Sequence, residues 1–183
     1  MGYLIGLGEP KNVAETLYAV ASAVDFANLN SCVGIVVRTE TALVAIHLVA
    51  TKSTQTFDAA TAQSVIDTIK RTVQNPKGVI LVGYPASWGD DDQNGAACAA
   101  AFMSLQASLV DLLDGKYELL RTFAMPQRLF VQGARCRATI AGAASQPAAV
   151  VAAGAEHADI FGVRIEYHRD APVLRKGNWV RAA

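Results

Sequence analysis

Apolar and polar residues alternate along this chain in blocks that predict helices and strands in succession. Apolar residues recur every three or four positions over 13–24, which predicts an amphipathic helix beginning after Pro10. The same reasoning gives the other elements: strands over 33–37, 43–49, 79–83 and 117–123, and helices over 58–74 and 93–113. Asp58 is a typical N-cap for the helix that follows it.

The order of these elements predicts the fold class. The connector between the first two strands is too short for a crossover, so they are expected to form an antiparallel hairpin. Each later helix lies between two strands, which implies a parallel, right-handed crossover. We therefore expect an α/β fold, a three-layer sandwich around a mixed, mostly parallel sheet.

The pattern is weaker beyond position 126. It allows a short strand over 128–131, a helix over 147–153, and a final strand or loop over 160–167. The tail from about position 170 has the polar composition, with proline and glycine, of a loosely ordered end. We find no linker, so residues 1–183 are expected to form a single domain.

Composition narrows the classes of function. The chain has 52% hydrophobic and 17% charged residues and no net charge, as a soluble globular domain does. That balance does not favour nucleic acid, which requires concentrated lysine and arginine. Apolar runs are interrupted by polar residues and no signal peptide is recognisable, so a cytoplasmic protein that does not bind a membrane is expected.

The stretch after the strand over 79–83 is the main candidate site. Tyr84 and Trp88 follow it, and three adjacent carboxylates, Asp90, Asp91 and Asp92, precede a helix. Loops at the carboxyl ends of strands are where α/β proteins place ligands.

The loop after the strand over 43–49 carries Thr51, Lys52 and Ser53. If the two strands are parallel neighbours, the two loops meet at one edge of the sheet. Together they predict a pocket for a small polar aromatic ligand, with donors on one side and acceptors and aromatic rings on the other.

The titratable residues leave alternatives open. The aspartates over 90–92 either stabilise a helix N-terminus or bind a divalent cation for a hydrolase or transferase. Cys32, Cys98 and Cys136 have no metal or disulfide spacing and are expected to be buried. His47 is expected in the core with one hydrogen bond.

Glu156, His157 and Asp159 bring an imidazole and two carboxylates together, as an acid/base pair or half of a metal site would, but the spacing places no second histidine beside them. Catalytic residues therefore stay unassigned, and no cofactor or metal is predicted.

The helix over 93–113 bears on partners. Its first turns, over 96–101, carry small residues on all sides, which permits close packing of helices within the chain or across a symmetric dimer. We expect a homo-oligomer. The leading hypothesis for function is a non-enzymatic module that binds a small polar ligand or a protein; the alternatives are a metal-assisted hydrolase or transferase and a structural assembly protein.

Four short segments resemble an uncharacterised family found in actinobacteria and their phages, domain-of-unknown-function family 4192. They lie over 10–24, over 31–37, at Val82-Gly83-Tyr84 and over 145–154. The chain departs from the family pattern over 24–28, where a histidine is missing, and over 127–131, where an aromatic strand is replaced. The resemblance implies a fold and an actinobacterial or phage origin, with a host protein as a possible partner, and no defined activity.

Overall fold

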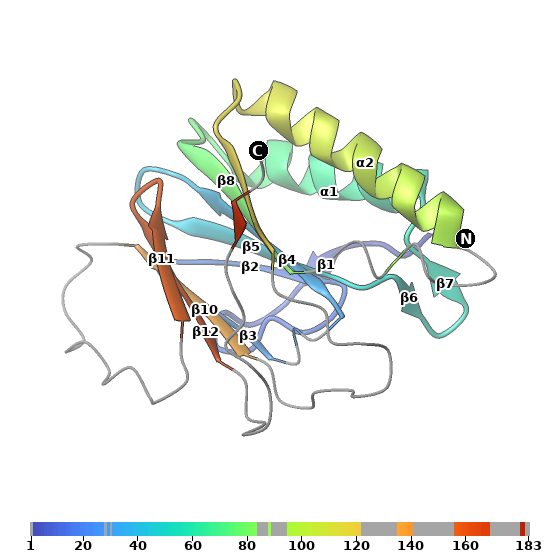
Figure 1. The fold of residues 1–183 in the computed structure, drawn as a ribbon, viewed down its shortest axis with the longest axis horizontal. Coiled ribbons are helices and arrows are strands. Elements are labelled where there is room, and N and C mark those ends of the chain that lie inside the picture. The colour runs from blue at the N-terminus through green and yellow to red at the C-terminus, as the bar shows by residue number, and fades with distance from the viewer. Residues whose placement is uncertain are drawn as a thin grey trace.

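The computed structural model describes residues 2–27, 29, 31–83, 88, 95–121, 135–140, 156–168 and 180–181. These residues form three layers: a pair of helices, a sheet of seven strands (the large sheet), and a second sheet of four strands (the small sheet). Figure 1 shows both helices on one face of the large sheet and the small sheet on the other. The α/β class is confirmed, although the helices among the described residues cover one face of the large sheet and not both.

The large sheet has the strand order β1-β2-β5-β4-β8-β9-β13. Its strands are β1 (Gly6–Leu7), β2 (Leu17–Ala21), β5 (Leu43–Leu48), β4 (Val33–Arg38), β8 (Gly78–Gly83), β9 (Tyr117–Arg121) and β13 (Val180–Arg181). Every residue of β5 and β8 is buried, as expected for central strands with both faces covered.

The sheet is mixed, and the expectation that it is mostly parallel is wrong. Only the pairs β1–β2 and β8–β9 are parallel among its described strands. The hairpin β4–β5 forms as predicted, but β4 then lies between β5 and β8 and pairs antiparallel with both. Strands β5 and β8 therefore point the same way without being neighbours, because the helix between them carries the chain past β4.

Two helices lie on one face of the large sheet, α1 (Ala59–Thr72) and α2 (Gly95–Leu112). The side chain of Asp58 caps α1 by accepting a hydrogen bond from the backbone N–H of Thr61 at 2.9 Å. The face of α1 predicted to point inward is buried, including Val65, Ile66 and Ile69. Helix α1 ends at Thr72 and α2 at Leu112, close to the predicted ends at positions 74 and 113.

The helix expected over 13–24 is not formed. This stretch contains β2 and a second strand, β3 (Ala23–Ala27), which bends away at Ser22 into the small sheet. Apolar spacing there fits a strand as well as a helix, since Ala19 is buried whereas its neighbour Val20 is 44% exposed. Pairing decides between them, because a helix would leave the edge of β5 without its strand partner β2.

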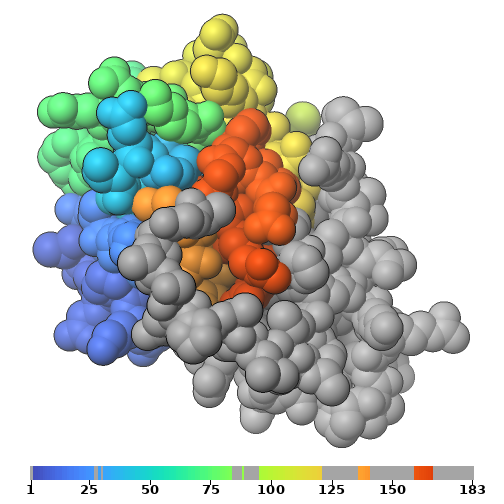
Figure 2. All heavy atoms as spheres, turned by 90° about the vertical axis from the view of Figure 1, so that its left-hand side faces the viewer, coloured from blue at the N-terminus to red at the C-terminus, as the bar shows by residue number. Residues whose placement is uncertain are grey.

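The small sheet has the order β11-β12-β10-β3. Strands β11 (Glu156–Ile160) and β12 (Val163–His168) form a hairpin, where a single final strand or loop was expected, and β10 (Arg135–Ile140) was not predicted. Positive φ angles of 51° at Phe161 and 71° at Gly162 make the tight turn. Figure 2 shows this hairpin in orange-red on the face that it presents, next to the lighter orange of β10.

The two sheets pack closely through their facing residues. A Cβ added to Gly34 of β4 would lie 3.3 Å from the ring of Phe26 in β3, so a larger side chain there would force the sheets apart. The strand expected over 128–131, the helix over 147–153, and most of the tail from 170 fall outside the described residues.

Candidate functional site

Strands β5 and β8 end at the same edge of the large sheet, although they are not the parallel neighbours that were predicted. Val33 of β4 pairs with Leu48, the last residue of β5, and with Gly83, the last residue of β8. The chain therefore leaves β5 and β8 on either side of the same residue. We call this edge the rim. The expectation that β5 and β8 are parallel neighbours is wrong, because β4 lies between them and separates the loops that follow them by a strand.

One side of the rim is a small hairpin, where the sequence predicted a polar loop. Strands β6 (Thr51–Lys52) and β7 (Gln55–Thr56) pair antiparallel, with Ser53 at a φ of 56° in the turn. Thr51, Lys52 and Ser53 are all exposed. The three donors predicted for a ligand site are therefore on the surface beyond β5.

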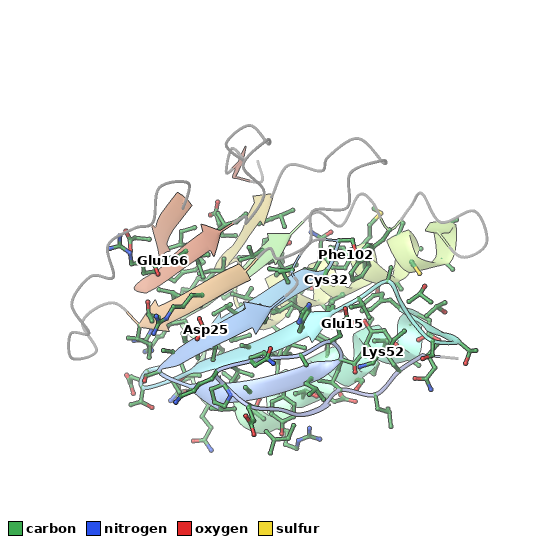
Figure 3. All side chains as sticks on the ribbon, turned by 90° about the horizontal axis from the view of Figure 1, so that it is seen from below. Glu15, Asp25, Cys32, Lys52, Phe102 and Glu166 are labelled. Atoms are coloured by element: carbon green, nitrogen blue, oxygen red, sulfur yellow. The ribbon has the colours of Figure 1, made fainter. Side chains whose placement is uncertain are left out.

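Lys52 is already engaged by the protein. Its ammonium group donates to the backbone carbonyl of Glu15 at 2.8 Å and to the hydroxyl of Thr16 at 3.1 Å. Figure 3 shows Lys52 and Glu15 on this side of the molecule. Lys52 thus holds the segment before β2 against the hairpin.

Trp88 is a core residue and not the exposed wall of a pocket. Its side chain is 1% exposed, and its indole N–H donates to the carbonyl of Ser31 at 2.8 Å. The ring centroid lies 5.1 Å from that of Phe57 and 5.2 Å from that of Phe102. A large aromatic side chain next to a charged loop was taken as a ligand contact, but it fills the space where α2 meets the large sheet.

Tyr3 extends this aromatic cluster at the rim. Its ring lies 6.2 Å from that of Phe57, and its hydroxyl donates to the carbonyl of Val49 at 2.6 Å and accepts from the Val49 amide at 3.1 Å. We define the aromatic cluster as Tyr3, Phe57, Trp88 and Phe102. Burial raises the pKa of Tyr3, so this hydroxyl stays protonated at neutral pH. The cluster fills the space beneath the rim.

The other half of the predicted pocket cannot be placed. Tyr84, Asp90, Asp91 and Asp92 lie outside the described residues. The ligand pocket therefore stays a prediction, with Thr51, Lys52 and Ser53 at one side of it. Within the described ranges, no group of three or more His, Cys, Asp or Glu side chains is placed to hold a metal ion.

Cys32, Cys98 and Cys136 are all buried, as expected. Burial raises the pKa of Cys32 to about 12. The pKa of Cys136 is also raised, by burial and then by the carboxylates of Asp25 and Glu166. Since the thiolate is the nucleophile, a protonated buried thiol is unsuited to covalent catalysis.

His47 lies in the core with one hydrogen bond, which confirms the expectation for it. Its Nδ1 lies 2.8 Å from the carbonyl oxygen of Val13, and its ring meets that of Phe26 at 88° with centroids 5.8 Å apart. The side chain is fully buried, and burial lowers its pKa below the usual 6.5.

Sequence reasoning missed the segment that covers His47. Thr16 adopts a φ of 67°, a conformation uncommon for a β-branched residue. Nothing in the local sequence marks it, because glycine or asparagine would be the usual signal and the segment had been assigned to a helix. Its backbone N–H donates to the carbonyl of His47 at 2.8 Å, a contact made only in the tertiary structure.

Helix α2 meets the criteria of length and composition for a membrane-spanning helix, with a mean hydropathy of 1.4 over 18 residues. This differs from the expectation that polar residues interrupt every long apolar run. A helix that packs on the core of a globular protein meets the same criteria, so this is weak support for a membrane role.

No family model, curated protein or solved structure matches this chain. The resemblance to family 4192 therefore stays a prediction.

Proposed function

We propose that this protein is a non-enzymatic binding module that acts through the exposed face of α2, and that a second copy of the chain binds there. The outward side of α2 supports this proposal more directly than any other described surface. The identity of a small ligand at the rim would be a separate matter, since half of that site lies outside the described residues.

A continuous apolar stripe runs along the outer face of α2. Its members are exposed and follow one another in steps of four and three residues: Ala96, Ala100, Met103, Ala107 and Val110. We call these five residues the α2 stripe. Met103 is 69% exposed and Val110 38% exposed. The buried residues of α2, such as Phe102 and Leu105, lie on the opposite side of the helix.

The neighbouring helix provides an internal comparison. Helix α1 lies on the same face of the same sheet and exposes Gln63, Asp67, Lys70 and Arg71. Helix α2 has a single charged residue, Asp111, in its last turn. The solvent-exposed face of a surface helix usually carries charged residues, as that of α1 does. An uncharged apolar face such as that of α2 indicates instead that a partner covers it.

A second copy of α2 suits this surface. Steps of four and three residues are the spacing that lets two helices interdigitate along a seam. Met103 lies at the middle of the stripe, so an antiparallel pair about a two-fold axis near it places Ala96 level with Val110 of the other copy. Met103 then faces Met103 of the other copy, with alanines on either side of it, and no like charges meet along the seam from Gly95 to Val110.

The proposal is tested by adding one charge to the stripe. Met103→Glu places two carboxylates near the two-fold axis, so we expect the variant to be a monomer where the wild type is a dimer, by light scattering at micromolar concentration. Gln63→Glu adds the same charge to the exposed face of α1 and should stay dimeric. Met103 is mostly exposed, so the variant should remain a folded monomer, and its melting temperature should fall only by what dimer formation contributes to the wild type. A monomeric wild type, or a dimeric Met103→Glu, would contradict the proposal.

A further inference from the structure

The segment of residues 13–16, which we call the strap, joins the two sheets at one end of the space between them. The amide of Val13 donates to the carbonyl of Asp25 in β3 at 2.8 Å. On the other side, the amide of Thr16 donates to the carbonyl of His47 in β5 at 2.8 Å. The side chain of His47 adds a third attachment through the carbonyl of Val13 at 2.8 Å.

This geometry fixes the protonation of His47. A carbonyl oxygen only accepts hydrogen bonds, so Nδ1 carries the proton and Nε2 carries the lone pair of a neutral imidazole. Nε2 is buried and has no hydrogen-bond partner within the part of the chain that the structure describes. A proton on Nε2 would create a cation without an acceptor, and the nearby ring of Phe26 would offset only a small part of that cost.

The strap also holds a strained residue. Thr16 keeps its positive φ of 67° while its amide binds His47 and its hydroxyl accepts from Lys52. Strain of this kind persists only where surrounding contacts enforce it. Losing the contact with His47 therefore removes part of what holds the strap closed.

Charged groups near His47 oppose one another. Burial has the largest effect on the pKa of His47 and lowers it, and the hydrogen bond to Val13 offsets part of this. Among the charged groups, Glu15 in the strap favours the imidazolium and Lys52 in β6 disfavours it. The carboxylate of Asp25 in β3 lies 3.7 Å from the guanidinium of Arg137. Both belong to the outer face of the small sheet, where Figure 3 shows Asp25. On β4 the residue opposite His47 is Gly34, which has no charge.

We propose that the strap is a latch released by acid: protonation of His47 detaches residues 13–16 from β5 and opens this end of the space between the sheets. Val13 and Phe26, both buried in the closed form, would become accessible. This inference goes beyond the proposed function and does not depend on α2.

The pH dependence follows from the direction of the pKa shift. In the closed form the pKa of His47 lies below 6.5, whereas in an open, hydrated form it returns to about that value. The open form therefore binds more protons below about pH 6.5. The opening equilibrium constant should rise by up to about tenfold for each pH unit below that point and stay constant above it.

Amide hydrogen exchange measured by NMR between about pH 7.5 and about pH 5 tests the latch. After correction for intrinsic exchange, the amides of Val13 and Thr16 should open more as the pH falls. The amide of Val79, bonded to the carbonyl of Lys116 at 2.9 Å in the large sheet, is the control: it exchanges through wider unfolding, so its opening free energy should stay well above that of the strap amides at every pH. His47→Asn keeps an N–H donor near Nδ1 but cannot titrate, so its strap amides should show no such pH dependence.

Three results would overturn the latch: no pH dependence of the strap amides in the wild type, an opening free energy of the strap amides equal to that of Val79, or the same pH dependence in His47→Asn. If that variant does not fold, the imidazole nitrogen shifts of the wild type decide instead. We expect a proton on Nδ1 and titration below pH 6.5; titration at or above the usual value, or a proton on Nε2 alone, would refute the mechanism.

Discussion

Replacing Trp88 distinguishes a core residue from a ligand contact. If the indole were the exposed wall of a pocket, Trp88→Ala would leave stability unchanged and affect only binding. In the structure it is 1% exposed, packs between Phe57 and Phe102, and donates to the carbonyl of Ser31. The structure therefore predicts a large loss of stability from the same substitution.

The size of the loss follows from what the side chain contributes. Truncating a buried tryptophan to alanine costs about 3–5 kcal/mol in transfer free energy and cavity formation. Trp88→Phe keeps an aromatic ring near Phe57 and Phe102 but loses the hydrogen bond to Ser31 and part of the volume, so we expect about 1–3 kcal/mol. For a chain of this length, the alanine variant should melt about 6–20 °C lower.

Urea unfolding followed by far-ultraviolet circular dichroism measures both variants. The free energy of unfolding should fall in the order wild type, Trp88→Phe, Trp88→Ala, with similar denaturant slopes. A loss below about 1 kcal/mol for Trp88→Ala at an unchanged slope would show that the aromatic cluster does not depend on this ring. That result would favour the alternative, in which Trp88 is exposed and contacts a ligand.

Two further substitutions test the surroundings of the rim. Asp58→Ala removes the α1 cap and should cost about 1 kcal/mol in urea unfolding at neutral pH. The hydrogen bond from the Thr61 amide lowers the pKa of Asp58, so the contribution of this carboxylate to stability is present above pH 3.8 and should be lost as the pH falls further. Asp58→Asn should not lose stability over this acid range. Equal acid sensitivity of Asp58→Asn and the wild type would contradict the role of the carboxylate. Gly83→Ala would place a Cβ 2.5 Å from the carbonyl oxygen of Cys32 at a φ of 148°, and should cost more than about 1 kcal/mol. Gly115→Ala, at a φ of 73° with no atom within 4 Å of the added Cβ, should cost less, and the reverse order in thermal melting would exclude a close approach of the two backbones.

Much of the chain between positions 33 and 121 is predictable because its signals are local. The strand patterns around Val36 and Leu81 are continuous apolar runs, and the α1 pattern is set by an N-cap at Asp58 and buried residues one turn apart. The burial of His47 also follows from its place in an apolar strand. The placement of Thr51, Lys52 and Ser53 beyond the end of β5 follows from the same strand prediction.

The errors occur where a partner distant in sequence decides the structure. Leu17 and Val24 fit helical spacing, yet β5 and β10 pair with this stretch as strands. The prediction of a mostly parallel sheet is wrong because β4 lies between β5 and β8, a strand order that no local sequence pattern reveals. The prediction that Trp88 lines a pocket is wrong because the sequence around it does not indicate its packing against Phe57 and Phe102.

By itself, the sequence determined which segments are helices or buried strands in the middle of the chain, and that the outer side of one helix carries no charge before Asp111. These are properties of short stretches, since residue spacing and composition control them directly. Only the tertiary structure decided strand order, the bend at Ser22, the filling of the rim by aromatic rings, and the strap over His47. Each of these depends on contacts between residues far apart in the chain, whose free energy exists only once the sheets and helices have packed.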